Sequence, residues 1–316
     1  MDYNGPFSIN NLPYGVITTN DNAQKRCAIA FQDSAIDLTI LQQAGLFREI
    51  PELEVRIFSH SWSKFAAFPE KVRQRFRQCL RSLILDRKVD AACIPLELVQ
   101  NHLPMETRNF SDFYCSLEHT RNCSEIFDIQ IRPNWFATPS VYNGRTSSLQ
   151  VSGTNFHRPH GMISSEEEGG KAEFRPETCM DFELEMGVWI CKSIPPGTRL
   201  DIDEAESHIF GMSLLNDWSA RCIQLFDMFP LGPFHAKGSA TTVSPWIVPI
   251  EALQQVKCGR MTSQDPPAPP HLYWKEESLA TFNIELRVEI LSLSPFSLSK
   301  AVGFGANNLY YFRTWD

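Results

Sequence analysis

The sequence predicts a mostly β, α+β protein with a small N-terminal domain and a larger C-terminal domain. Short apolar segments bounded by turn residues recur along the chain, and this pattern is typical of strands. One long stretch, residues 69–88, has helical spacing instead. A proline-interrupted segment, residues 93–113, separates these N-terminal elements from β-rich segments divided by loops. We therefore place the domains at residues 1–105 and 106–316.

The N-terminal elements follow from local patterns. Residues 26–38, "RCAIAFQDSAIDL", predict two short strands joined by a turn at residues 32–34, and residues 52–58, "ELEVRIF", predict another strand. In residues 69–88 the apolar positions repeat every three or four residues, which predicts one buried helix face. The seven basic side chains of this segment are expected to form a solvated face, because an acidic protein without an aromatic platform is unsuited to nucleic acid.

The C-terminal elements are shorter. Residues 203–212, "DEAESHIFGM", predict a helix with Asp203 as a possible N-cap. Three segments are expected to be loops: residues 166–171, 194–198 and 264–270, of which the last two contain several prolines. Asp217 follows the apolar run "IFGMSLL", so it should lie at the end of a buried element.

The stretch "DFELEM", residues 181–186, alternates acidic and apolar side chains. A strand places residues i, i+2 and i+4 on one face, so Asp181, Glu183 and Glu185 would share an acidic face with neighbouring carboxylates ~7 Å apart. If that face is exposed, solvation explains it. If it is buried, the repulsion is costly and a divalent cation would relieve it.

Composition limits the partners. The chain has 316 residues and a net charge of -8, which argues against nucleic acid or an anionic membrane as the main partner. No apolar run approaches the roughly 18 residues of a membrane span, and no secretory signal is present at the N-terminus. Nine cysteines without a C-x-x-C motif indicate buried reduced thiols and a cytoplasmic protein.

Three further polar clusters could carry chemistry. In "NDWSARCIQ", Asp217, Arg221 and Gln224 would share one face of a helix, although a simple N-cap with an i,i+4 ion pair is an alternative. In "SDFYCSLEH", Asp112 is a possible oxygen ligand and His119 a possible general base, although a lone histidine is more often structural. "KGSATT", residues 237–242, offers an ammonium and hydroxyls that suit an anion, or forms an ordinary polar turn.

Taken in order, these blocks resemble the fumarylacetoacetase family. The resemblance runs through "NLPYGV", "SDFYCSLEHT", "PNWFATPSVYNGRTSSLQVSGT", "DFELEMGVWI", "HIFGMSLLNDWSARCIQ" and "LGPFHAKGSATTVSPWIVP". It implies an N-terminal SH3-like barrel, a C-terminal mixed β-roll and a homodimer. It also implies hydrolysis of a carbon–carbon bond in a β-diketo acid, with 4-fumarylacetoacetate giving fumarate and acetoacetate at the end of tyrosine and phenylalanine catabolism.

The resemblance also implies roles for individual residues. Asp112, Glu183, Glu185 and Asp217 would ligate a divalent ion, Ca²⁺ or Mg²⁺, and Lys237 and Thr241 fall beside that cation site. His119 falls on the general base that activates water, with Arg221 and Lys237 stabilising developing charge. Tyr114, Tyr142, Arg221 and Gln224 fall on substrate or oxyanion contacts.

Three departures from the family pattern modify these expectations. Asp128 stands where family members carry an arginine for a substrate carboxylate, although Arg121 or Arg132 could substitute, and Met228 stands where a tyrosine is expected. Family members also continue well beyond the position of Asp316, so we expect an incomplete β-roll. Two alternatives follow: an impaired homologue with a binding or regulatory role, or an oxo-acid decarboxylase or tautomerase on the same scaffold.

Overall fold

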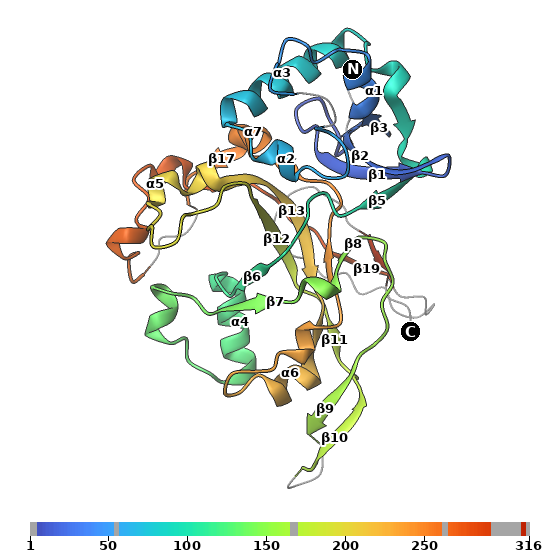
Figure 1. Cartoon of the computed structure of the whole chain (residues 1–316). Coiled ribbons are helices and arrows are strands. Elements are labelled where there is room, and N and C mark those ends of the chain that lie inside the picture. The colour runs from blue at the N-terminus through green and yellow to red at the C-terminus, as the bar shows by residue number, and fades with distance from the viewer. Residues whose placement is uncertain (1–4, 54–56, 165–169, 261–264, 292–310, 314–316) are drawn as a thin grey trace.

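The structure is a computed structural model that describes residues 5–53, 57–164, 170–260, 265–291 and 311–313. Figure 1 shows the N-terminal elements gathered at one end of the molecule, while the pair of strands β9 (His160–Ser164) and β10 (Ala172–Pro176) projects from the other end. The strand-rich mixture of sheets and short helices confirms the predicted mostly β, α+β class. None of the helices in the described part of the chain has the length and apolar character that a bilayer crossing requires.

The N-terminal part contains one antiparallel sheet with the strand order β4-β3-β2-β1-β5. Its strands are β1 (Tyr14–Thr19), β2 (Asn22–Phe31), β3 (Ser34–Asp37), β4 (Cys93–Pro95) and β5 (Val99–His102), and its helices are α1 (Leu38–Gln43), α2 (Ser63–Ala66) and α3 (Glu70–Leu85). Among the described residues no pairing joins β4 to β5, so the sheet is open rather than a closed barrel.

Two of the predicted N-terminal elements are present. The strands β2 and β3 and the turn between them lie where residues 26–38 predicted them, and α3 occupies most of residues 69–88. The strand predicted at residues 52–58 is absent from the described residues of that segment, which form turns and a bend, and residues 54–56 lie outside the described part. The single antiparallel bridge there, Arg26 to Ser59, lies beyond the predicted span.

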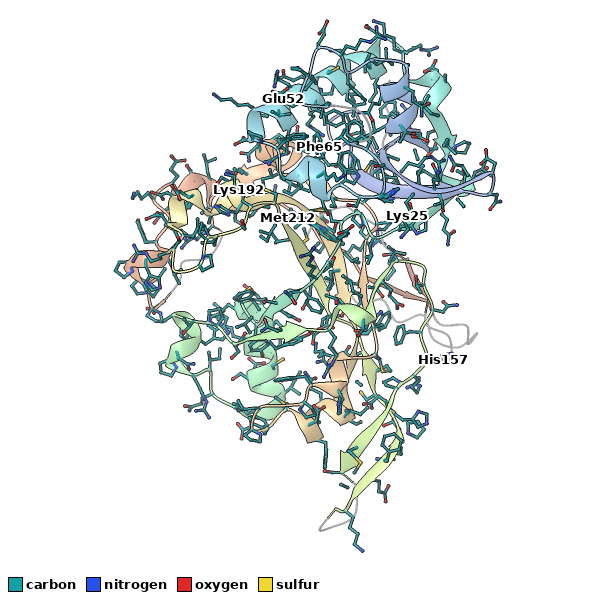
Figure 2. All side chains as sticks on the ribbon, in the orientation of Figure 1. Lys25, Glu52, Phe65, His157, Lys192 and Met212 are labelled. Carbon is teal, nitrogen blue, oxygen red and sulfur yellow. The ribbon has the colours of Figure 1, made fainter. Side chains whose placement is uncertain are left out.

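The N-terminal core is aromatic. Tyr14 stacks on Trp62 with ring centroids 4.3 Å apart, and Phe65 and Phe76 pack against each other at 4.9 Å. Figure 2 shows Phe65 among the packed side chains of this domain. All four rings are fully buried, so this cluster removes a large apolar area from water and stabilises the fold.

The same core joins the two parts of the chain. The Phe210 ring, from the C-terminal strand β13 (Ile209–Asp217), lies 5.6 Å from the Tyr14 ring, and Tyr14 and Ile247 exchange two backbone hydrogen bonds of 2.8 Å. Arg73 of α3 forms a buried 2.9 Å ion pair with Glu251. These contacts hold the N-terminal core directly against the sheet that carries the candidate site.

The C-terminal part is built from one mixed sheet and several two-stranded pairs. The sheet has the order β12-β13-β15-β8, and β16 also pairs with β13. Its strands are β8 (Leu149–Val151), β12 (Leu184–Ile190), β13 (Ile209–Asp217), β15 (Thr241–Val243) and β16 (Val248–Pro249). The pairs are β6 (Phe110–Phe113) with β7 (Val141–Gly144), β9 (His160–Ser164) with β10 (Ala172–Pro176), β11 (Met180–Asp181) with β14 (Ser219–Ala220), β17 (Lys257–Cys258) with β18 (Thr281–Phe282), and β19 (Glu289–Leu291) with β20 (Tyr311–Arg313).

The C-terminal helices are short: α4 (Leu117–Phe127), α5 (Ile202–Ala205), α6 (Arg221–Asp227) and α7 (Ile250–Leu253). The helix predicted over residues 203–212 is wrong beyond its first turns. After α5 and a 3₁₀ turn at Glu206–His208, the chain enters β13 at Ile209. Asp201, not Asp203, caps α5, because its side chain accepts the Asp203 N–H at 3.0 Å. Pairing of β13 with β12, β15 and β16 explains why its apolar run is a strand.

The predicted loop at residues 194–198 is confirmed as turn and irregular structure. Residues 165–169 and 261–264 lie outside the described part, so the other two predicted loops are only partly covered. In their described portions, residue 170 is irregular and residue 171 immediately precedes β10. Residues 265–269 are bend and irregular, and a short 3₁₀ turn begins at Pro270.

Candidate metal centre

Strand register brings three of the predicted residues into one row. In the antiparallel alignment Leu184 opposes Asn216 and Asp181 opposes Ser219, so Glu183 faces Asp217. On the other side of β13, Asp217 pairs with Thr241 of β15. Because opposed side chains in a sheet are direct neighbours, residues distant in sequence meet at one point of the sheet.

The stretch "DFELEM" is not one continuous strand. It is divided between β11 and β12 at Phe182 and Glu183. The Glu183 N–H donates to the Asn216 side-chain oxygen at 3.1 Å, while the Glu183 carbonyl accepts the Asp217 N–H at 3.1 Å. The Asn216 side chain therefore replaces one backbone hydrogen bond, and the register between the two chain segments is the same on both sides of Phe182 and Glu183. This keeps Glu183 and Glu185 close to the end of β13.

A second element supplies another acid. Asp112 of β6 lies opposite Tyr142 of β7, and the Tyr142 hydroxyl donates to Asp217 Oδ2 at 3.0 Å. Each of Asp112, Glu185 and Asp217 offers a carboxylate oxygen within 4.8 Å of the others. These three carboxylates, which we call the acidic triad, come from three separate strands.

Lys237 lies beside the acidic triad. It belongs to a 3₁₀ turn, His235–Lys237, and its Nζ is 2.8 Å from Asp217 Oδ2 and 2.7 Å from Glu183 Oε2. All three side chains are largely buried, and Asp217 is fully buried. The ammonium therefore bridges two carboxylates that would otherwise repel each other at short range.

Arg221 occupies the other side of Glu183. Its guanidinium lies 2.8 Å from Glu183 Oε1 and 2.6 Å from Asp181 Oδ2, and Nη1 also donates to Gln224 Oε1 at 2.8 Å. Glu183 is thus held by two cations, and the three-carboxylate cluster does not include it. Asp181, which the sequence placed on the same acidic face as Glu183, instead orients Arg221. The predicted role of Glu183 as a fourth metal ligand stays a prediction.

The predicted base lies on α4. The Ser116 hydroxyl accepts the His119 N–H at 3.3 Å and caps this helix. The His119 ring stands edge-on to the Tyr114 ring at 5.3 Å, and Nε2 is 3.8 Å from Cys123 Sγ. Among the described residues, no glutamate or aspartate side chain forms a hydrogen bond with this ring, whose neighbours are Tyr114 and Cys123.

The acidic triad fits a divalent cation. Asp217 Oδ1 and Thr241 Oγ1 are buried and lack a hydrogen-bond partner among the described residues, although a buried polar atom without one is costly. A hard cation prefers oxygen ligands of this kind. We therefore assign Asp112, Glu185 and Asp217 as the residues that would hold it, with Thr241 beside them.

The electrostatics agree with this assignment. Burial, reinforced by Asp112 and Asp217, raises the pKa of Glu185 to about 9. Burial also raises the pKa of Asp217 to about 7, despite the opposing effect of Lys237. In contrast, Lys237 and Arg221 together outweigh burial and lower the pKa of Glu183. Without a bound cation, Glu185 and Asp217 therefore hold protons that ordinary carboxyl groups would lose, whereas Glu183 is ionised and paired with Lys237 and Arg221.

Thermal stabilisation by Mg²⁺ is expected to grow with pH. In the metal-free protein the native state retains protons on Glu185 and Asp217 that the unfolded chain has lost, so stability falls as pH rises toward about 9. A bound cation keeps both groups ionised and removes this loss. Melting curves with and without Mg²⁺, between about pH 6 and about pH 9, measure the effect. A melting-temperature gain that does not change with pH would contradict it.

Several positioning residues gave no signal in the sequence. The Asp227 carboxylate accepts the His235 N–H at 2.8 Å, and Arg145 donates to the carbonyls of Phe234 and Pro233 at 2.8 and 2.6 Å. Together these bonds fix the turn that carries Lys237. Only the folded chain brings these residues together, so a local reading of "KGSATT" could not identify them.

The two positions that depart from the family pattern, Asp128 and Met228, lie at helix ends. Asp128 adopts the left-handed conformation that terminates α4, and its side chain is exposed. Met228 is the C-cap of α6 and is half-buried. Arg121 and Arg132, the possible replacements for an arginine at position 128, are both exposed.

Comparisons with known proteins cover most of the chain. A family model described as "Fumarylacetoacetase N-terminal" matches residues 10–104, and one described as "Fumarylacetoacetate (FAA) hydrolase C-terminal" matches residues 108–290. The fumarylacetoacetase fahA of Aspergillus fumigatus is 35% identical over 98% of this chain and 76% of its own length. The fumarylacetoacetase of Arabidopsis thaliana is 36% identical over 90% of this chain and 70% of its own length.

Solved structures give a weaker likeness. A fumarylacetoacetate hydrolase from psychrophilic Exiguobacterium antarcticum aligns with a TM-score of 0.40 and 15% identity, over 77% of this chain and 68% of that one. A maleylpyruvate hydrolase from Sphingobium sp., in complex with manganese(II) and pyruvate, aligns with a TM-score of 0.38 and 13% identity, over 75% of this chain and 67% of that one.

Proposed function

This chain belongs to the fumarylacetoacetase family, and on that premise we propose that it is a metal-dependent hydrolase of a carbon–carbon bond in a β-diketo acid. The observation that carries the proposal is the acidic triad, with Lys237 and Arg221 adjacent to it. Three convergent carboxylates suit a hard divalent cation, for which we propose Mg²⁺ or Ca²⁺. A cation held there would supply Lewis acidity toward the two oxygens of the diketo group.

We assign the remaining roles to side chains around the triad. Lys237 and Arg221 would stabilise the negative charge that develops as water adds to the carbonyl carbon and the neighbouring carbon departs. Their own contacts fix them in place before the reaction, since both are bound to Glu183. Such preorganised charges need no rearrangement as the transition state forms.

We further assign proton transfer to His119 and substrate contacts to Tyr114, Tyr142 and Gln224. Tyr114 packs against the His119 ring, which limits the orientations of the imidazole. Burial, together with Asp217 and Asp112, raises the pKa of Tyr142, so its hydroxyl keeps its proton and remains a donor. A neutral donor beside Asp217 can orient that carboxylate or an oxygen of the substrate.

The substrate we propose is 4-fumarylacetoacetate or a related acylpyruvate, as in tyrosine and phenylalanine catabolism. The names of the curated relatives support the first, whereas Asp128 and Met228 make the second worth testing. These names also disfavour an impaired regulatory homologue. All nine cysteines are free thiols, which supports a cytoplasmic location.

We propose two domains, 1–105 and 106–316, and a homodimer. The ranges of the two family models support the domain boundary. Exposed apolar side chains on the C-terminal part support the dimer. Among them, Phe113 and Val141 are opposed on β6 and β7, and Phe174 and Met162 are opposed on β10 and β9. Such adjacent apolar pairs favour contact with another protein surface.

The test is loss of diketone absorbance when the purified protein is mixed with 4-fumarylacetoacetate or acylpyruvates in Mg²⁺ or Ca²⁺. We expect turnover of at least one of these substrates, and expect a chelator to remove it because the triad then lacks its cation. The control is the same mixture with the chelator and an excess of the metal restored. No absorbance loss with any substrate and either metal would contradict the proposed function.

A further inference from the structure

Glu177 is a buried carboxylate outside the acidic triad. It lies between β10 and β11, and only 1% of its surface is exposed. Its Oε1 accepts the backbone N–H groups of Thr178 and Cys179, each at 2.7 Å, and its Oε2 accepts the N–H of Ile223 at 3.0 Å. A buried carboxylate bonded in this way joins two segments of the chain that are distant in sequence.

One of those segments is the first turn of α6. The N-cap residue, Ala220, makes no side-chain hydrogen bond to the helix, and Ile223 is the third helical residue. The first N–H groups of a helix have no partner within the helix, so they need one from elsewhere. Glu177 supplies it from the connection between β10 and β11, and its negative charge also suits the positive end of the helix dipole.

The other segment leads directly to the partner of Arg221. From Glu177 the chain runs through Cys179, whose carbonyl accepts the Arg221 N–H at 3.0 Å, to Asp181, whose carboxylate accepts Arg221 Nε at 2.7 Å. Glu177 therefore ties the start of α6 to the short segment that holds the Arg221 side chain. Gln224, which also contacts Arg221, lies on the same helix.

The backbone of Glu177 is also held by hydrogen bonds on both sides of the side chain. Its N–H donates to the Pro159 carbonyl at 2.9 Å, and its carbonyl accepts from Arg158 at 3.1 Å. Burial opposes ionisation of the carboxyl, but the N–H groups of Cys179 and Ile223 outweigh it and lower its pKa. The Glu177 carboxylate is thus an ionised acceptor of three backbone N–H groups.

We infer that Glu177 is a positioning residue that sets the place of the Arg221 guanidinium in the active site. The expected kinetic effect rests on the proposed function, in which Arg221 stabilises the negative charge that develops in the transition state. Within the described part of the chain, Glu177 forms no hydrogen bond or ion pair with the acidic triad or with Lys237, so its role differs from metal binding.

The test compares Glu177→Gln with Asp37→Asn. Asp37 is also buried and also caps a helix, by accepting the Thr39 N–H at 2.9 Å, but it lies in the N-terminal domain. Glutamine keeps the shape of Glu177 and presents an N–H₂ group toward backbone donors. We expect Glu177→Gln to lower kcat about 10- to 100-fold with KM within about twofold, as misplacement of a transition-state group does. Mg²⁺ affinity should stay at the wild-type value in both variants, and Asp37→Asn should keep wild-type kcat.

A double-mutant cycle with Arg221→Ala identifies the route of the effect. If Glu177 acts through Arg221, then Glu177→Gln changes kcat/KM by less than about twofold in the Arg221→Ala background. An additive loss, or a loss no larger than that of Asp37→Asn, would overturn the inference. A crystal structure of Glu177→Gln shows the position of the Arg221 side chain and does not depend on enzyme activity. A displaced guanidinium supports the inference even if the wild type proves inactive, and an unmoved one overturns it.

Discussion

Asp217→Asn is expected to lower kcat about a thousandfold and to abolish Mg²⁺-dependent stabilisation. Asp217 is the fully buried member of the acidic triad, and its Oδ1 is one of the unpartnered buried atoms at the site. Asparagine keeps the size of the side chain but removes its negative charge. A metal ion contributes several kcal/mol of charge stabilisation, and loss of about 4 kcal/mol corresponds to about a thousandfold in rate.

The matched control for this variant is Glu251→Gln. Glu251 is also a largely buried, ion-paired carboxylate, but its partner is Arg73 and it lies away from the acidic triad. We expect Glu251→Gln to lower the melting temperature while keeping kcat and the response to Mg²⁺. Asp217→Asn with wild-type Mg²⁺ affinity, measured by calorimetry, would show that Asp217 does not hold the cation.

Lys237→Met is expected to damage both stability and catalysis. The substitution leaves the buried carboxylates of Glu183 and Asp217 without the ammonium that lies within 2.8 Å of both. Breaking a buried ion pair by removing one partner costs about 3–5 kcal/mol, which urea unfolding measures. Loss of the preorganised charge should lower kcat by about 10²- to 10³-fold.

Lys257→Met provides the comparison for Lys237. Lys257 also pairs with a glutamate, Glu206, at 2.5 Å, but at the more exposed junction near α5. Because the Glu206 side chain is 29% exposed, loss of that ion pair should cost less than the loss in Lys237→Met and should leave turnover unchanged. Mg²⁺ should raise the melting temperature of Lys237→Met more than that of the wild type. The variant lacks the ammonium that pairs with Glu183 and Asp217, so a bound cation relieves more carboxylate repulsion. Equal stability losses in the two variants would refute the account of Lys237.

The sequence predicted those parts of the fold that depend on local pattern. The apolar spacing of Val72, Phe76 and Leu80 located α3, and all three side chains are buried. The helix expected over residues 203–212 failed because sheet pairing decides the conformation of Ile209 to Met212, and such pairing depends on distant strands.

At the site, too, the sequence predicted what depends on local pattern and missed what depends on distant segments. The alternation in "DFELEM" correctly indicated neighbouring acids near a sheet, but not what neutralises each of them. Glu185 belongs to the acidic triad, whereas Glu183 is bound by Lys237 and Arg221. Two glutamates only two positions apart therefore have different electrostatic environments. Their difference arises from the turn before β15 and the start of α6, which local patterns do not place relative to β12.

Hydrolysis of a carbon–carbon bond with the aid of a cation held by the acidic triad is tested most directly by product analysis. The products are measured by mass spectrometry in water enriched in oxygen-18, with Mg²⁺-loaded wild type and Asp217→Asn. The wild type should release two acids, one of them carrying a single oxygen-18 atom in the carboxylate formed by cleavage, and the variant should release almost none. Loss of carbon dioxide, an isomerised substrate, or equal cleavage by the variant would contradict the claim.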